Sequence, residues 1–147
     1  MSLRDRLTEE MKGAMKARDD LRLSAIRMVR GAVKNREIEH KHEFDDREIC
    51  EVIASLVKQR RESIRLFRDG ARVDLAEKEE RELQVLLEFL PPQMEGAELD
   101  ELVMKAISEC GATGIKDLGK VMKVLAPLVS GRADGKVVAD AVKSKLL

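Results

Sequence analysis

The sequence predicts an all-α protein, with an N-terminal four-helix subdomain followed by a small three-helix C-terminal subdomain. Residues that favour helix dominate the composition, chiefly Ala, Leu, Glu, Lys, Arg and Met. Apolar residues recur at steps of three and four rather than in alternation, which is the helical period. The composition changes at Pro91-Pro92: residues 1–92 hold 14 Arg and 6 Lys, and residues 93–147 hold 1 Arg and 7 Lys. We therefore place the subdomains at 1–92 and 93–147.

The first two helices are marked by polar residues that can cap their N-termini. Ser2 is a good N-cap, and the helix that follows has an apolar stripe at the helical period. Asp19 and Asp20 interrupt that stripe and can cap a second helix, whose apolar pattern ends by His40. The stripes are Leu3, Leu7, Met11, Ala14 and Met15 in the first helix, and Leu21, Ala25, Met28, Val29, Ala32 and Val33 in the second.

The third and fourth helices complete the first subdomain. Asp45 and Asp46 can start the third, and Gly70 stops it. The fourth runs from about Asp74 to Leu90, where the double proline ends it because proline lacks an N–H and clashes with the preceding turn.

Three shorter helices are expected after the double proline, at about 97–109, 115–129 and 135–146. Glycines supply the turns between them, in the segments 111–114 and 131–135, because glycine tolerates a positive φ angle.

Composition excludes several classes of protein. No apolar run approaches the roughly 20 residues that a membrane span needs, so no membrane partner is expected. The N-terminus is charged from Arg4 and lacks the apolar region of a signal peptide. The chain has only two cysteines, Cys50 and Cys110, so no disulfide framework is expected. We expect a soluble, cytoplasmic protein.

No catalytic, metal or cofactor motif is complete. His40 and His42 have no cysteine or further histidine near them in sequence, so a polar loop is the better interpretation. Cys50 and Cys110 are expected near the core. The mixed-charge run 77–82 is expected to be a solvated face. Gly119-Lys120 lacks the rest of a phosphate-binding loop. The prediction is no cofactor, no metal and no catalytic residue.

Basic residues gather on two helical faces of the first subdomain although the net charge is zero. Arg27, Arg30 and Lys34 share one face, in a stretch from 21 to 36 that has five bases and no acid. Arg61 and Arg65 share another with Arg68 and Arg72. Such faces are typical of nucleic-acid binding, because guanidinium groups fit phosphate oxygens. The alternative is that these arginines pair with acids of neighbouring helices.

The second subdomain has its own basic candidates, which are Lys120, Lys123, Arg132 and Lys136, with Lys116 beside them. Backbone N–H groups near Gly135 offer a further place for a phosphate. The chain has three Phe and no Tyr or Trp, and Phe67 and Phe89 lie on stripes that look like core. Stacking on bases is therefore not expected, and any RNA contact should be to backbone and shape. No DNA partner is expected.

Several segments resemble one family in the same order along the whole chain. They are MKGAMKAR at 11–18, LSAIRM at 23–28, GARVDL at 70–75, LEFLPPQ at 87–93, DLGKVM at 117–122 and GRADG at 131–135. The family is that of the YqeY-like proteins, small bacterial proteins similar to the C-terminal tail of the B subunit of glutamyl-/aspartyl-tRNA amidotransferase. The resemblance implies two all-helical subdomains and a tRNA or a tRNA-linked enzyme as partner.

The resemblance also implies a family-level label, carbon–nitrogen ligase activity with glutamine as amido-N-donor. This sequence has no ATP site and no Ser–Lys amidase arrangement, so we interpret the label as inherited from the larger enzyme. The leading hypothesis is a non-catalytic, tRNA-associated helical protein. The alternative is a protein-interaction module that docks on a tRNA-linked enzyme or on itself, with Leu90 and Met94 expected as exposed apolar residues near the junction.

Overall fold

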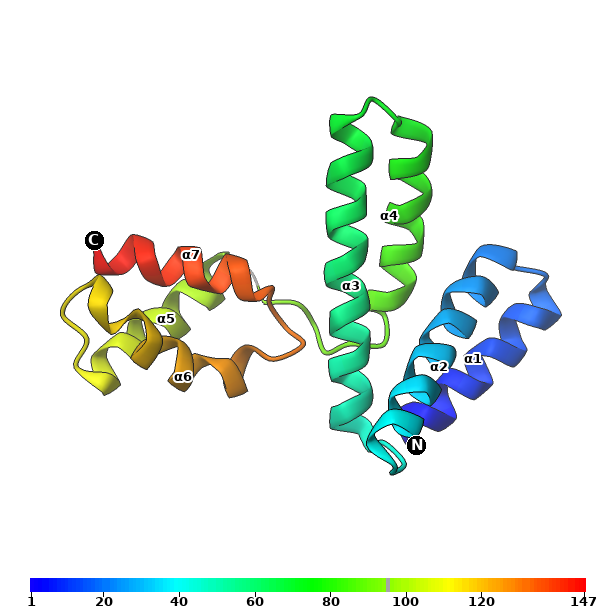
Figure 1. Cartoon of the computed structure of the whole chain (residues 1–147), viewed down its shortest axis with the longest axis horizontal. Helices are drawn as coiled ribbons and strands as arrows, with labels where there is room; N and C mark the ends of the chain where they lie inside the picture. Colours follow the sequence, from blue (N-terminus) through cyan, green and yellow to red (C-terminus); the bar gives the residue numbers. More distant parts are fainter. Residues whose placement is uncertain (95) are drawn as a thin grey trace. The chain divides into compact units, whose positions relative to one another are not determined.

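The computed structural model describes residues 1–94 and 96–147, and within them every regular element is a helix (Figure 1). The all-α prediction is confirmed. Contacts divide the chain into two compact units, Met1–Pro91 and Pro92–Leu147. Helices α1–α4 form the first unit and α5–α7 form the second.

Four helices build the N-terminal unit, and three of them start at the caps that the sequence predicts. The Ser2 hydroxyl accepts a hydrogen bond from the Asp5 amide, and Asp19 accepts from the Arg22 amide. Asp45 and Glu48 form a reciprocal capping box at the start of α3. The helices are α1 Leu3–Ala17, α2 Asp20–His40, α3 Asp46–Asp69 and α4 Val73–Leu87.

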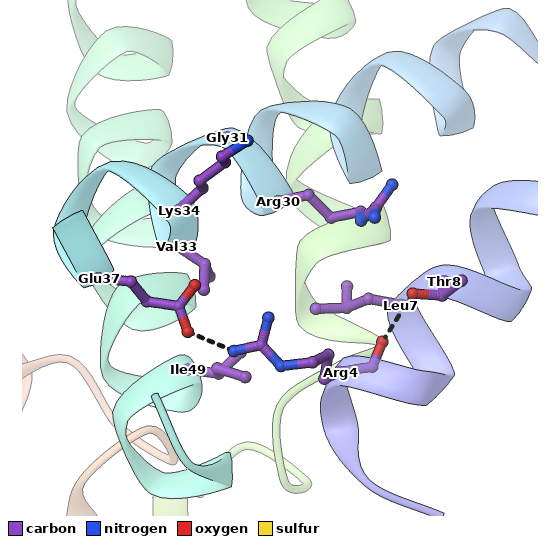
Figure 2. A pocket seen from close by; sticks show the side chains of 9 residues that line it. All are labelled: Arg4, Leu7, Thr8, Arg30, Gly31, Val33, Lys34, Glu37 and Ile49. Atoms are coloured by element: carbon purple, nitrogen blue, oxygen red, sulfur yellow. Dashed lines mark hydrogen bonds and ion pairs between the residues drawn. The ribbon is translucent and has the colours of Figure 1, made fainter. Parts of the chain in front are cut away.

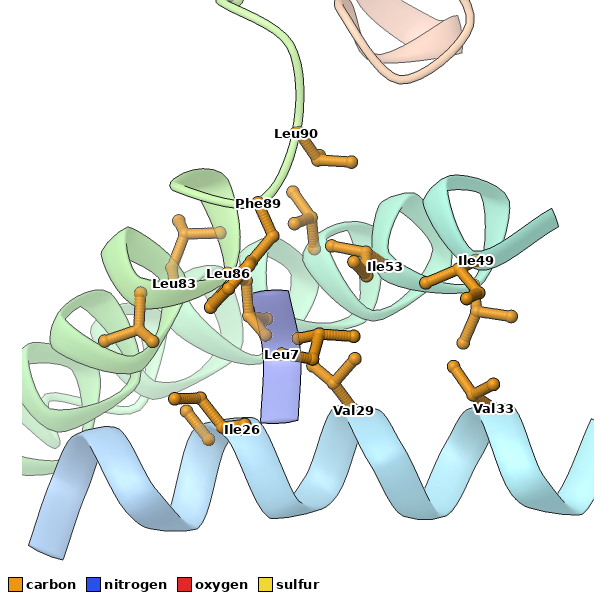
Figure 3. Close-up of a cluster of buried hydrophobic side chains, with 14 of the residues drawn as sticks. Leu7, Ile26, Val29, Val33, Ile49, Ile53, Leu83, Leu86, Phe89 and Leu90 are labelled. Carbon is orange, nitrogen blue, oxygen red and sulfur yellow. The ribbon is translucent and has the colours of Figure 1, made fainter. Parts of the chain in front are cut away.

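Helices α3 and α4 lie side by side as a hairpin, and α1 and α2 form a second pair (Figure 1). The faces that these helices turn inward form one apolar core (Figure 3). Its fully buried members include Ile26 and Val29 of α2, Ile53 of α3 and Leu86 of α4. Val29 belongs to the apolar stripe predicted for the second helix, and Ile26 lies beside that stripe.

The end of α4 departs from the prediction. The helix ends at Leu87 instead of Leu90, and the last amides bond three residues back, with Leu90 N donating to Leu87 O at 3.2 Å. This tight turn leads the chain into Pro91-Pro92. The expectation that Leu90 and Met94 are exposed is wrong. Leu90 packs against the first core and Met94 against the second, and both are buried.

The C-terminal unit is a three-helix arrangement with its own core. It consists of α5 Gly96–Cys110, a short 3₁₀ helix η1 at Ile115–Asp117, α6 Leu118–Val129 and α7 Gly135–Leu146. The helix expected at 115–129 is therefore split into a 3₁₀ turn and α6. Gly111 and Gly131 have the expected left-handed backbone, with φ of 65° and 74°. Val103, Val121, Leu125, Val138 and Val142 are fully buried between the three helices.

The acidic run on α4 is only partly a solvated face. Glu82 is buried and Glu79 is half-buried, because both carboxylates meet Arg60 of α3. A charge pattern along one helix cannot reveal which acids face a basic neighbour. Cys50 and Cys110 are half-buried beside the cores, as expected.

Candidate nucleic-acid interface

Two arginines of α3 form ion pairs with α4. Arg60 meets Glu79 at 2.6 Å and Glu82 at 3.0 Å, and Arg68 pairs with Glu80. The Arg60 pairs are partly desolvated, so removing one partner would leave a charge uncompensated between the two helices, whereas the Arg68–Glu80 pair is exposed. Arg60 and Arg68 therefore pair with acids of a neighbouring helix, as the alternative to RNA binding predicts.

The two α3 candidates, Arg61 and Arg65, also have partners. Arg65 pairs with Glu62 and, at 3.5 Å, with Asp69 on its own helix. The hydrogen bond to Glu62 raises the pKa of Arg65, so the guanidinium stays charged. Arg61 has an interaction partner as well. RNA binding by these two side chains stays a prediction.

The α2 candidates differ from those on α3. Arg27, Arg30 and Lys34 are exposed, and across residues 1–94 and 96–147 none of them lies within ion-pair distance of a carboxylate. Arg30 has one close polar contact, with the Met11 sulfur at 2.8 Å. The other arginines of the helix are engaged: Arg22 pairs with Glu10 at 2.7 Å and Glu88 at 2.5 Å, and Arg36 donates to Ser55 at 3.1 Å.

A pocket of about 550 Å³ lies beside this basic face, between α1 and α2 (Figure 2). Arg30 and Lys34 line it from α2, and Arg4 and Thr8 line it from α1. The apolar lining is Leu7, Val33 and Ile49.

Glu37 is the only carboxylate among the residues that line this pocket, and it is already engaged. It accepts the Phe44 amide at 2.6 Å and pairs with Arg4. These contacts, led by the Phe44 amide, lower the pKa of Glu37, so it is ionised at neutral pH. Arg4 and Glu37 are 33 residues apart, and no local sequence signal joins them. Sequence reasoning missed the pocket for this reason.

The basic candidates of the C-terminal unit lie on α6 and α7. Lys120 and Lys123 are exposed on α6, and Lys136 is exposed in the first turn of α7. Asp117 lies beside this set. The Thr113 amide lowers the pKa of its carboxyl, with help from the charges of Lys120 and Lys116. The described part of the chain places no carboxylate within 4.0 Å of Lys123 or Lys136.

Arg132 has a different environment from the three lysines. Its Nε donates to the Pro92 carbonyl at 3.1 Å, and its Nη2 meets Glu98 Oε1 at 3.0 Å. The Met94 amide donates to the Arg132 carbonyl at 2.6 Å. Arg132 thus joins the α6–α7 turn to the segment that leads into α5, a structural role that the sequence did not indicate.

The phosphate site predicted at Gly135 stays a prediction, and one of its backbone amides is already engaged. Asp134 is the N-cap of α7, and its carboxylate accepts the Lys136 amide at 2.8 Å. The chain therefore supplies its own anion at that helix N-terminus.

The histidines and cysteines were considered above as possible metal ligands or reactive groups. Within the described residues, no cluster of three or more His, Cys, Asp or Glu side chains is placed to hold a metal ion. His42 contacts Glu48 at 2.6 Å, and this bond raises the pKa of His42. Burial raises the pKa of Cys50, which disfavours a thiolate.

A comparison with protein families decides the identity of the chain. The model described as "Yqey-like protein" matches residues 4–146. The chain belongs to the YqeY-like family. The resemblance drawn from the six sequence segments is thus confirmed over nearly the whole length.

Curated relatives of this YqeY-like chain carry the name "Altered inheritance of mitochondria protein 41, mitochondrial". The protein of Vanderwaltozyma polyspora is 34% identical over 119 residues, which is 76% of this chain and 64% of the relative. That of Lachancea thermotolerans is 34% identical over 106 residues, 70% of this chain and 57% of the relative. That of Pyrenophora tritici-repentis is 30% identical over 141 residues, 94% and 77% respectively. The chain spans about three fifths of the length of the two yeast relatives. No helix in the described residues is long and apolar enough to cross a membrane.

Proposed function

We propose that this protein is a non-catalytic RNA-binding protein that associates with tRNA. One observation supports the proposal: after the internal ion pairs are formed, six candidate cations remain exposed and outside any ion pair in the described residues. They are Arg27, Arg30 and Lys34 on α2 and Lys120, Lys123 and Lys136 on α6 and α7. Desolvating an unpaired surface cation against phosphate breaks no existing salt bridge, so these side chains are the ones available to RNA.

The burial of the aromatic residues favours contact with the RNA backbone over base stacking. Phe44 and Phe89 are buried, and Phe67 is half-buried against the first core. No phenyl ring is therefore presented as a platform for a base. Recognition would rest on phosphate positions along a folded RNA, which suits tRNA better than an unstructured strand.

The tRNA partner is inferred from the family. YqeY-like proteins resemble the tail of a tRNA-dependent amidotransferase, and the chain belongs to that family. We interpret the carbon–nitrogen ligase label as inherited from the larger enzyme. We propose that the protein acts in the cytoplasm, because its cysteines, Cys50 and Cys110, are both free, as is usual in a reducing compartment.

The test is tRNA binding measured across a range of salt concentrations. The α2 variant carries Arg27→Ala, Arg30→Ala and Lys34→Ala, and the second variant carries Lys120→Ala, Lys123→Ala and Lys136→Ala. Each phosphate contact contributes about 0.7–0.9 to the slope of log K against log salt, so loss of three contacts should reduce the slope by about 2–3. Arg132 is left intact because it holds the segment before α5.

Matched controls remove the same charge from other exposed lysines. Lys12, Lys16 and Lys78 serve for the first unit, and Lys105, Lys143 and Lys145 serve for the second. These control triples should leave the slope nearly unchanged. Equal losses in a candidate triple and its control would mean that net charge alone governs binding. Absence of tRNA binding by the intact protein at low salt, with recovery of a nuclease-resistant protein complex from cells, would favour the protein-docking alternative instead.

A further inference from the structure

We propose that the pocket between α1 and α2 binds a small organic phosphate. Arg30 and Lys34 would hold the phosphate group, and the organic body would lie over Leu7, Val33 and Ile49 (Figure 2). This inference goes beyond RNA binding, because the ligand is a small molecule held in a pocket of the N-terminal unit.

The size and lining of the pocket suit such a ligand. Its volume of about 550 Å³ lies within the roughly 300–1,000 Å³ of known small-molecule sites. Leu7, Val33 and Ile49 are themselves buried at 3%, 4% and 1% exposure and belong to the first core. The apolar floor is therefore part of the packed interior and offers a defined surface to an apolar body.

The charges of the residues that line the pocket favour an anionic ligand. Three cations line it, and the one carboxylate, Glu37, is neutralised by Arg4 and accepts the Phe44 amide. Among the lining residues, Arg30 and Lys34 are then an excess of two positive charges. Arg4 also meets Glu43, which does not line the pocket, at 3.3 Å. A phosphate monoester carries about −1.5 to −2 at neutral pH, which matches that excess.

Arg30 and Lys34 also retain hydrogen-bond donors for the phosphate. A guanidinium has five N–H donors, and the only close polar contact described for Arg30 is to the Met11 sulfur, a weak acceptor. Figure 2 shows Lys34 lying along α2 beside Gly31, at the rim of the pocket, on the same helix as Arg30. An ammonium on a flexible stem can turn toward a phosphate held there.

Gly31 supports access to the pocket from this rim. It lies in the interior of α2, where glycine is unfavourable compared with alanine. A Cβ atom built on Gly31 meets nothing within 4 Å, so no close packing of helices requires glycine. A longer side chain at this position would stand between Arg30 and Lys34 and narrow the opening.

The experiment is a methyl NMR titration of the full chain with three matched probes: phenyl phosphate, phenol and inorganic phosphate. Phenyl phosphate should shift the methyl signals of Leu7, Val33 and Ile49 and leave those of Val138 in the second unit unmoved. Inorganic phosphate should bind more weakly, and phenol should cause no saturable shift. Phenyl phosphate that binds no more tightly than inorganic phosphate, or shifts scattered over both units, would overturn the proposal.

Variants separate the pocket from the general charge of the surface. Arg30→Ala or Lys34→Ala should weaken phenyl phosphate binding about tenfold or more, the loss typical of a charge-assisted hydrogen bond, while Lys12→Ala should not. Gly31→Leu should abolish binding, and Gly13→Leu is its control, because Gly13 is also helical, also has open space at Cβ and does not line the pocket. Binding unchanged in Gly31→Leu would refute the inference.

Gly31→Leu also keeps this inference distinct from the proposed function, because it retains every cation of α2. A failure to bind phenyl phosphate, with tRNA binding intact, removes the pocket site and leaves the proposed function standing. Loss of tRNA binding with phenyl phosphate bound as expected does the reverse.

Discussion

Ala71, between α3 and α4, has a left-handed backbone with φ of 59°. The preceding Gly70 has φ of −85°, so the left-handed position falls on alanine and the glycine beside it takes an ordinary conformation. The turn is held by the Arg72 amide, which donates to the Phe67 carbonyl at 2.7 Å. An L-residue in this region costs about 1–2 kcal/mol, because its Cβ approaches the following carbonyl.

We expect Ala71→Gly to stabilise the N-terminal unit by about 0.5–1 kcal/mol. Glycine removes the steric cost of the left-handed conformation, but it loses more backbone entropy on folding than alanine, which offsets part of the stabilisation. Urea unfolding followed by far-UV circular dichroism measures this, as the chain has no Trp or Tyr for fluorescence. Gly70→Ala is the control. Its Cβ would lie 3.4 Å from the Leu66 carbonyl oxygen, a tolerable contact, so its effect should stay within about 0.5 kcal/mol. A destabilised Ala71→Gly protein would contradict this account of the turn.

Helix starts were predictable because their signals are local. Ser2, Asp19 and Asp45 each cap an amide three residues later, and that spacing can be read directly from the sequence. Helix ends were less predictable. Leu87 ends α4 where the pattern continued to Leu90, because the approach to Pro91 tightens the last turn.

The basic faces illustrate what the sequence cannot decide. Helices α2 and α3 have the same spacing of bases, yet Arg68 pairs with Glu80 of α4, and Arg27 has no ion pair among the described residues. The difference depends on which helix packs beside each face, and that is a property of the tertiary structure. The pocket also depends on the tertiary structure, since Arg4 and Glu37 come together only when α1 and α2 pack against each other.

The N-terminus of α3 links a helix cap to a histidine. Glu48 accepts the Asp45 amide through Oε1 and contacts His42 Nε2 through Oε2 at 2.6 Å. The hydrogen bond to Glu48 is the main cause that raises the pKa of His42 above its ordinary 6.5. Because the folded-state pKa is the higher one, the contribution of His42 to stability is complete below about pH 6.5. It is lost as the pH rises through the folded-state pKa.

We therefore expect Glu48→Gln to lower the pKa of His42 toward 6.5. Glutamine keeps the capping-box hydrogen bond at this position, so the helix start survives while the carboxylate charge is lost. An NMR titration of the His42 ring proton gives the pKa directly. In the unmodified protein, the free energy of unfolding should decline between pH 6.5 and the raised pKa, and this decline should be smaller in the variant. An unchanged His42 titration would show that Glu48 is not the cause.

Across the whole molecule, the apolar residues form two cores that share no member. The first is built from α1–α4 and the second from α5–α7 with Met94. The two sequence positions that flank the double proline, Leu90 and Met94, contribute to different cores. Each unit buries its own apolar surface, which is the condition for a cooperative folding unit.

We expect core substitutions to act on one unit at a time. Leu86 and Leu125 are completely buried, one in each core, so Leu86→Ala or Leu125→Ala should cost about 2–5 kcal/mol in the unit that contains it. Native-state amide hydrogen exchange reads both units in one sample. Leu86→Ala should speed the exchange of core amides in α2–α4 and leave those of α6 and α7 at their original rates, and Leu125→Ala should do the opposite. Matched acceleration in both units from either substitution would mean that the chain unfolds as one body, and the boundary at Pro91-Pro92 would then have no energetic meaning.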